Sequence, residues 1–79
     1  MTFDELLGEY LRVARKRKMK IIAEIATEAN IDEKHLGKIE NGNSLPNAYT
    51  LFKLYKVLDI DINRMFDEIS EKMSSEKHE

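Results

Sequence analysis

Basic side chains that could bind a polyanion are concentrated in the middle of this 79-residue chain. Between Arg12 and Lys56 the sequence holds ten lysines and arginines against five acidic residues, whereas both ends are acidic. The formal net charge is only −2, so the total conceals this asymmetry. A basic middle on an otherwise acidic chain indicates a face that attracts phosphates or another polyanion, although a run of charges can also be an ordinary solvated surface.

Catalytic and metal chemistry has little support in the sequence. No cysteine is present, which excludes thiolate ligands, redox pairs and disulfides. His35 and His78 are too far apart in the sequence to suggest a shared metal, and Ser44 has no base or oxyanion donor that the sequence can show. We therefore expect no enzymatic activity, no metal, no cofactor and no small-molecule ligand.

Apolar residues recur at helical spacing in five stretches and predict an all-α fold without strands. The first stretch, which predicts a helix ending near Lys18, holds Phe3, Leu6, Leu7, Tyr10, Leu11 and Ala14. The others lie at residues 22–29, between Asp32 and Asn41, at 51–58 and at 62–73. Boundary signals agree with these helices, because Asp32 and Asp61 can cap helix starts, Asn41-Gly42 can end a helix and Pro46 can precede one.

The chain length allows one small domain, which we place at residues 1–73, followed by a polar, frayed tail at 74–79. The last stripe consists of Ile62, Phe66, Ile69 and Met73. Either these residues form a dimer surface, or Ile62 and Phe66 complete the core and the other two cap it. The acidic N-terminus and short apolar runs argue against a signal peptide or a membrane span, so a cytoplasmic protein is the expectation.

The second and third predicted helices are separated by so short a turn that they cannot lie antiparallel. They must cross steeply, as in a helix-turn-helix unit. Ala26 is small enough for the crossing point, Asn30 tolerates the left-handed backbone of the turn, and Ile31 can fill the space beneath it. The expected core of this unit comprises Ile25, Ala26, Ala29, Asn30, Ile31, Leu36 and Ile39.

In this register the sequence resembles the Cro/lambda-repressor-like (Xre-type) helix-turn-helix family of transcriptional regulators. The resemblance runs without a gap from Gly8 to Phe66, about three-quarters of the chain. It implies a compact five-helix domain and a buried ion pair between Arg15 and Glu40. It also implies sequence-specific binding to double-stranded DNA by a homodimer on a pseudo-palindromic operator, with repression as the expected outcome.

The resemblance also implies which residues contact DNA. The family's base-reading positions lie on the face opposite Leu36 and Ile39, and they are occupied here by Glu33, Lys34 and Lys38. The chemistry of these side chains allows them to contact bases. Lysine can donate to guanine O6 and N7, and glutamate can accept from cytosine N4. Contacts to the phosphate backbone are expected from Arg17, Lys18, Lys20, Gly37, Asn41, Asn43 and Ser44. Tyr49 and Tyr55 are instead expected to be core or packing residues.

The start of the second helix departs from the family pattern. Ile21-Ile22 replace the usual serine or threonine cap and glutamine, and Met19-Lys20 replace the usual glycine and buried leucine. We expect Met19 or Ile21 to fill the vacated core position. Exposed isoleucines on this helix favour an alternative function, in which the same fold is a protein-binding module (antitoxin-like, anti-repressor or adaptor) with weak or no DNA binding.

Overall fold

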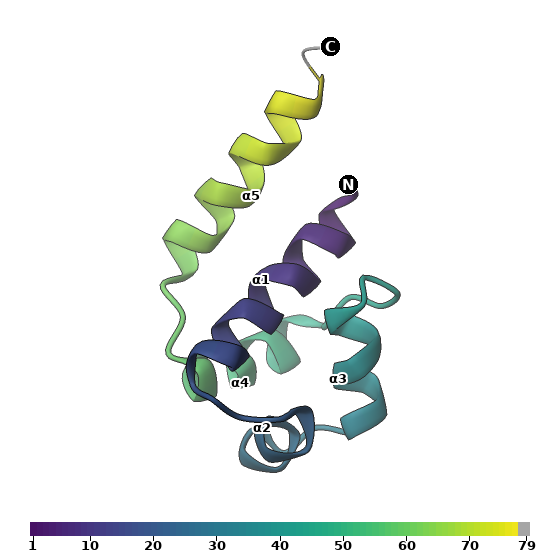
Figure 1. Cartoon of the computed structure of the whole chain (residues 1–79), viewed down its shortest axis with the longest axis vertical. Helices are drawn as coiled ribbons and strands as arrows, with labels where there is room; N and C mark the ends of the chain where they lie inside the picture. Colours follow the sequence, from purple (N-terminus) through teal and green to yellow (C-terminus); the bar gives the residue numbers. More distant parts are fainter. Residues whose placement is uncertain (78–79) are drawn as a thin grey trace.

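The computed structural model describes residues 1–77, all of whose regular structure is helical. The five helices are α1 (Phe3–Arg17), α2 (Ile22–Ala29), α3 (Glu33–Glu40), α4 (Ala48–Leu58) and α5 (Ile62–Lys77). The prediction of an all-α, five-helix domain is confirmed. In Figure 1, α1 runs through the middle of the molecule, with α3 and α5 on opposite sides of it and α2 at one end.

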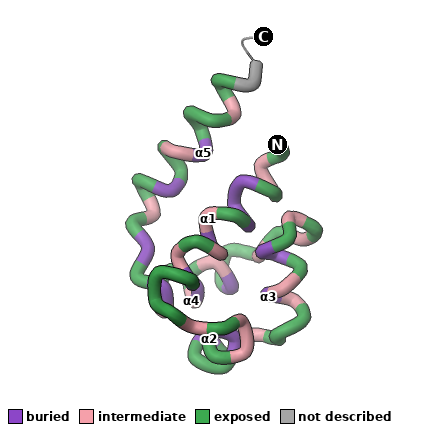
Figure 2. Tube along the Cα trace, viewed as in Figure 1, coloured by how far each residue is buried: buried purple, intermediate pink, exposed green. Residues whose placement is uncertain are grey.

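Every helix contributes to one core. The largest fully buried side chains are Leu11 of α1, Ile25 of α2, Leu36 and Ile39 of α3, Leu54 of α4 and Met65 of α5. Helix α1 contacts α3, α4 and α5, while α2 contacts α3 and α4. Figure 2 shows the buried positions alternating with exposed ones along each helix, as expected of amphipathic helices around a shared interior.

Side-chain caps fix the helix starts. The Asp32 carboxylate accepts from the His35 N–H at 3.0 Å, and Asp61 accepts from the Arg64 N–H at 3.1 Å, as the sequence predicted. Thr2 and Asn47 cap α1 and α4, two caps that the sequence analysis missed. At α1 the cap is reciprocal, since the Glu5 carboxylate accepts from the Thr2 N–H at 2.8 Å, and this bond lowers the pKa of Glu5.

The turn between α2 and α3 has the geometry that its sequence predicted. Asn30 adopts a left-handed conformation (φ 54°), and the Ile31 N–H donates to the Ala26 carbonyl at 2.9 Å. Ala26 and Ala29 are buried where the helices meet, while Ile31 is half-buried against the core. Helix α3 then ends at Gly42 (φ 78°), where a residue with a side chain would be strained.

A buried ion pair joins α1 to α3. Arg15 donates from Nε to Glu40 Oε2 at 2.8 Å and from Nη2 to Glu40 Oε1 at 2.9 Å, and its Nη1 donates to the Lys20 carbonyl at 2.8 Å. Both side chains are buried, and the carboxylate raises the pKa of Arg15 above its ordinary value. One guanidinium therefore connects the middle of the fold to the end of α3 and to the segment that precedes α2.

The stripe on α5 is not a free surface. Ile69 is only 3% exposed and belongs to the core, and Ile62 and Met73 are partly buried against it, which leaves Phe66 at 40% exposure. The reason is that α5 runs beside α1, which covers most of this stripe. The chain also stays helical through Lys77, beyond the expected start of a frayed tail at residue 74. Residues 78 and 79 of that tail lie outside the described part.

Neither residue expected to fill the core position before α2 does so. Met19 is 91% exposed and Ile21 is 63% exposed. Met19 is the left-handed residue that ends α1 (φ 57°), and its side chain lies in solvent. Lys20, at the position where the family has a buried leucine, is half-buried, and its ammonium pairs with Glu28 at 2.7 Å. Within the described residues, none of the helices has the length and apolar character needed to span a membrane.

Two glycines should respond oppositely to the same substitution. A Cβ at Gly8 would overlap the Ile39 carbonyl oxygen and lie 2.7 Å from the Glu40 carbonyl oxygen, whereas a Cβ at Gly37 would meet nothing within 4 Å. We expect Gly8→Ala to lower the free energy of unfolding by about 1–3 kcal/mol through overpacking. Gly37→Ala should raise it by up to ~1 kcal/mol through helix propensity. Urea denaturation measures both, and equal effects would contradict the close contact at Gly8.

The two ion pairs of different burial give a second test. Glu40→Gln leaves the buried Arg15 without a carboxylate and should lower the free energy of unfolding by about 3–5 kcal/mol. Glu68→Gln breaks the exposed pair with Arg64 (3.3 Å) and should change it by less than ~0.5 kcal/mol. Thermal or urea unfolding measures the free energy of unfolding of both variants. If the Glu40→Gln protein is as stable as the Glu68→Gln protein, the buried pair does not have this structural role.

Candidate nucleic-acid interface

Helix α3 has one face in the core and one face in solvent. Leu36 and Ile39 are buried, whereas Glu33, Lys34 and Lys38 are exposed. None of these three charged side chains forms a hydrogen bond or ion pair with any described residue. The outer face of α3 therefore presents one carboxylate and two ammonium groups whose hydrogen-bonding capacity is unused within the described chain.

Many of the other basic residues are already engaged. Arg15 pairs with Glu40, Lys20 with Glu28, and Arg64 with Glu68. Arg12 donates to Asn41 Oδ1 at 2.9 Å and to the Glu40 carbonyl at 3.4 Å. The two lysines of α3 are not engaged in this way, and they are among the cations that are available to an external acceptor.

The segment after α3 uses more of its donors internally than the sequence suggested. The Gly42 N–H donates to the Ile39 carbonyl at 3.1 Å, and the Asn43 N–H donates to the Lys38 carbonyl at 2.9 Å. These backbone amides close the end of α3 and do not point to solvent as free donors. Donors left for phosphate contacts include the side-chain amides of the exposed Asn41 and Asn43 and the hydroxyl of the half-buried Ser44.

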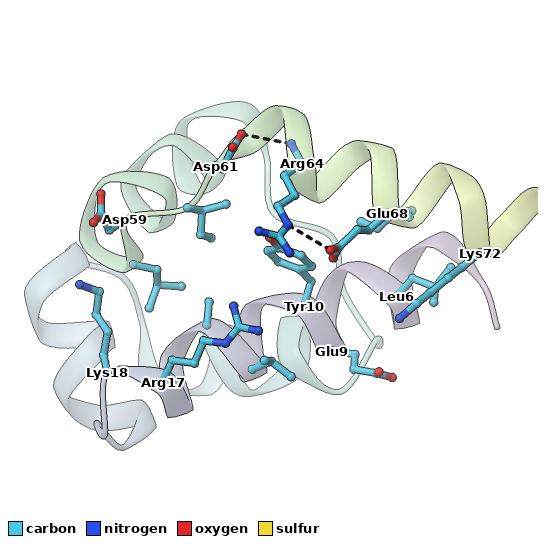
Figure 3. Close-up of a pocket in the computed structure, with 15 residues that line it drawn as sticks. Leu6, Glu9, Tyr10, Arg17, Lys18, Asp59, Asp61, Arg64, Glu68 and Lys72 are labelled. Atoms are coloured by element: carbon cyan, nitrogen blue, oxygen red, sulfur yellow. Dashed lines mark hydrogen bonds and ion pairs between the residues drawn. The ribbon is translucent and has the colours of Figure 1, made fainter.

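Two expected phosphate contacts lie apart from the α3 face, and a third is already paired. Arg17 and Lys18 line a cavity between α1 and α5, as Figure 3 shows, and Lys20 is paired with Glu28. The structure thus brings Glu33, Lys34 and Lys38 together on α3, beside the turn that holds Asn41 and Asn43. It does not gather the basic residues at the end of α1 onto the same surface.

The N-terminus of α2 has lost the polar cap typical of the family. Ile21 has no side-chain acceptor, and the Glu24 carboxylate accepts from the Ile21 N–H at 3.0 Å instead. A carboxylate at a helix N-terminus is electrostatically favourable, but it occupies the place where an anion from a ligand would bind. This end of α2 is consequently a poorer phosphate site than a serine- or threonine-capped one.

Two contacts around α4 were missed by the sequence analysis. Lys53 donates to the Asn30 carbonyl at 3.1 Å, so α4 holds the turn between α2 and α3, and the same ammonium lies 4.5 Å from the centre of the Tyr49 ring. Tyr49 was expected to be a core or packing residue; it does not lie in the core, and its exposed ring packs against Lys53. The spacing of Tyr49 and Lys53 by four residues could have indicated their contact, but nothing local indicates the bond to Asn30.

Comparison with known proteins identifies the family. The helix-turn-helix family matches residues 11–64, which is more than half of the chain. The HTH-type transcriptional regulator SlrR of Bacillus subtilis (strain 168) is 33% identical over 73 residues, covering 91% of this chain and 47% of that protein. The chain thus spans about half the length of this relative. These matches confirm the family expected from the residues, and the chain belongs to the helix-turn-helix family.

Proposed function

We propose that this chain binds double-stranded DNA sequence-specifically and acts in transcriptional regulation by inserting α3 into the major groove. The observation that carries this proposal is the outer face of α3, where Glu33, Lys34 and Lys38 are exposed and unpartnered among the described residues while the inner face is held in the core. The name of the relative, a transcriptional regulator, supports the same function.

The side chains of α3 define what the helix would read. Lys34 and Lys38 donate to guanine O6 and N7, and Glu33 accepts from cytosine N4. Gly37 leaves open space on this face, which permits close approach of the backbone to DNA. Contacts from Asn41, Asn43 and Ser44 to phosphates set the position of the helix without adding sequence information. The carboxylates of Asp32 and Glu33 weaken nonspecific binding, so discrimination rests on correct base contacts.

Repression follows from occupancy of an operator, without any catalysed reaction. A two-fold dimer would place two α3 helices about one turn of DNA apart. The pairing patch that remains after the burial of Ile69 is centred on Phe66, with half-buried Ile62 and Met73 beside it. Sedimentation of the chain with a duplex operator tests this pairing, because it distinguishes two copies per duplex from one.

A second function is favoured by the exposed apolar residues before and at the start of α2. Ile22, expected to be exposed, is half-buried against the core, whereas Ile21 and Met19 are both largely exposed and flank Lys20, which is paired within the chain. Such a surface suits a protein-binding module of the same fold, such as an antitoxin-like protein, an anti-repressor or an adaptor. Ile21→Ser would then abolish partner binding and leave any DNA affinity unchanged.

Replacement of the α3 lysines separates the two functions. We expect Lys34→Gln and Lys38→Gln each to weaken binding to the selected DNA site by about 1–3 kcal/mol and to relax base preference at one position. Lys56→Gln, on the exposed side of α4, is the matched control for loss of one charge and should have a smaller effect that is uniform across sequences. Fluorescence anisotropy at fixed salt measures all three, with circular dichroism as the check on folding.

If both α3 variants retain the affinity and base preference of the parent protein, α3 is not the reading helix and the proposed function fails. If the parent protein binds no duplex while remaining folded, the protein-binding alternative takes its place. If the α3 variants lose only as much DNA affinity as Lys56→Gln does, the α3 lysines attract DNA by charge alone. That result would contradict sequence reading by α3.

A further inference from the structure

A groove lies between α1 and α5. Its volume is about 480 Å³, and it is lined by α1, by the turn between α4 and α5, and by one side of α5. This volume lies within the range of small-molecule sites, which is roughly 300–1,000 Å³. Figure 1 places α5 and α3 on opposite sides of α1, so the groove is separate from the proposed DNA-reading face.

The floor of the groove is apolar and rigidly held. Leu6, Leu58, Ile60 and Ile69 line it and are buried core residues, and half-buried Ala14 lies among them. Along α1 the groove runs from Leu6 to Lys18, a length of about 18 Å at ~1.5 Å per residue. An extended apolar chain that lies along α1 would contact this floor together with Tyr10 and Val13, which also line the groove.

Charges on the rim are not all available to a ligand. The Arg64 guanidinium pairs with Glu68 at 3.3 Å, and the Asp61 carboxylate accepts from the Arg64 N–H. Arg64 therefore offsets the charge of Glu68, whereas Asp61 bonds to a backbone amide and keeps its negative charge. Figure 3 shows Glu9 and Lys72, one carboxylate and one ammonium, toward the end of the groove near Leu6.

The other end of the groove carries unused positive charge. The side chains of Arg17 and Lys18, in and after the last turn of α1, form no hydrogen bond or ion pair with any residue that the structure describes. Asp59 is the carboxylate nearest to this end in Figure 3, and neither cation forms an ion pair with it. A location near a helix C-terminus favours basic residues in itself, but the apolar floor beside them adds a second determinant of binding.

We propose that this groove binds an amphipathic organic anion. Its carboxylate or phosphate head contacts Arg17 and Lys18, and its apolar chain lies along the floor formed by Leu6, Leu58 and Ile69. Charge-assisted bonds to the head and removal of the chain from water both favour such a ligand over a neutral or a purely ionic one. The site does not depend on the proposed DNA binding and can be tested without DNA.

Decanoate is a suitable probe, used below the concentration at which it forms micelles. Titration followed by amide NMR should show saturable binding of one molecule, with shifts along α1 and α5. Arg17→Gln combined with Lys18→Gln should weaken binding by about tenfold or more, because both charge-assisted contacts are lost. Lys16→Gln is the matched control, since Lys16 is exposed on the same helix but does not line the groove.

Two further ligands define the head group. Decanol, which has the same chain without the charge, should bind about tenfold more weakly than decanoate. The affinity of decyl phosphate, compared with that of decanoate, shows whether the site prefers a phosphate or a carboxylate head. The proposal is overturned if Lys16→Gln weakens binding as much as the double variant, if shifts centre on the exposed Tyr49 and Phe52 of α4, or if binding does not saturate.

Discussion

The ion pair between Arg15 and Glu40 determines how the helix-turn-helix unit is held on the rest of the fold. Burying two charges is unfavourable unless their hydrogen bonds are met, and here the guanidinium donates to both carboxylate oxygens and to the Lys20 carbonyl. Gly8 makes the arrangement possible, because a side chain there would overlap the carbonyl groups at the end of α3. Together they fix α3 against α1 in one orientation.

That orientation separates the two faces of α3. Once Leu36 and Ile39 are in the core, Glu33, Lys34 and Lys38 lie in solvent without partners among the described residues. A helix as short as α3 could read bases only if its backbone is held rigidly, because each base contact depends on the position of a long, flexible side chain. The Lys53 bond to the Asn30 carbonyl adds support from α4 at the turn. Core, turn and surface thus form one system for presenting α3.

Local signals accounted for the helices and the turn. The spacing of Leu6, Leu7 and Leu11 placed α1, and Asp32 and Asn30 marked the ends of the turn because their preferences are set by nearby backbone. Features that depend on contacts between distant segments were not predictable in this way. Ile69 has the same spacing whether it faces α1 or a partner, and only the path of α5 beside α1 decides that it is buried. The sequence likewise could not place Arg17 and Lys18 on the α5 groove. Base-reading roles for Lys34 and Lys38 remain predictions.

Selection from a pool of randomised duplex DNA at near-physiological salt tests the central claim most directly. If α3 reads bases and two copies act together, the pool should be enriched for an inverted repeat with half-sites about one helical turn apart, and affinity for it should fall steeply as salt rises. Absence of any enriched sequence, with the protein folded in the same buffer, would contradict the proposal that the exposed face of α3 is a DNA-reading surface.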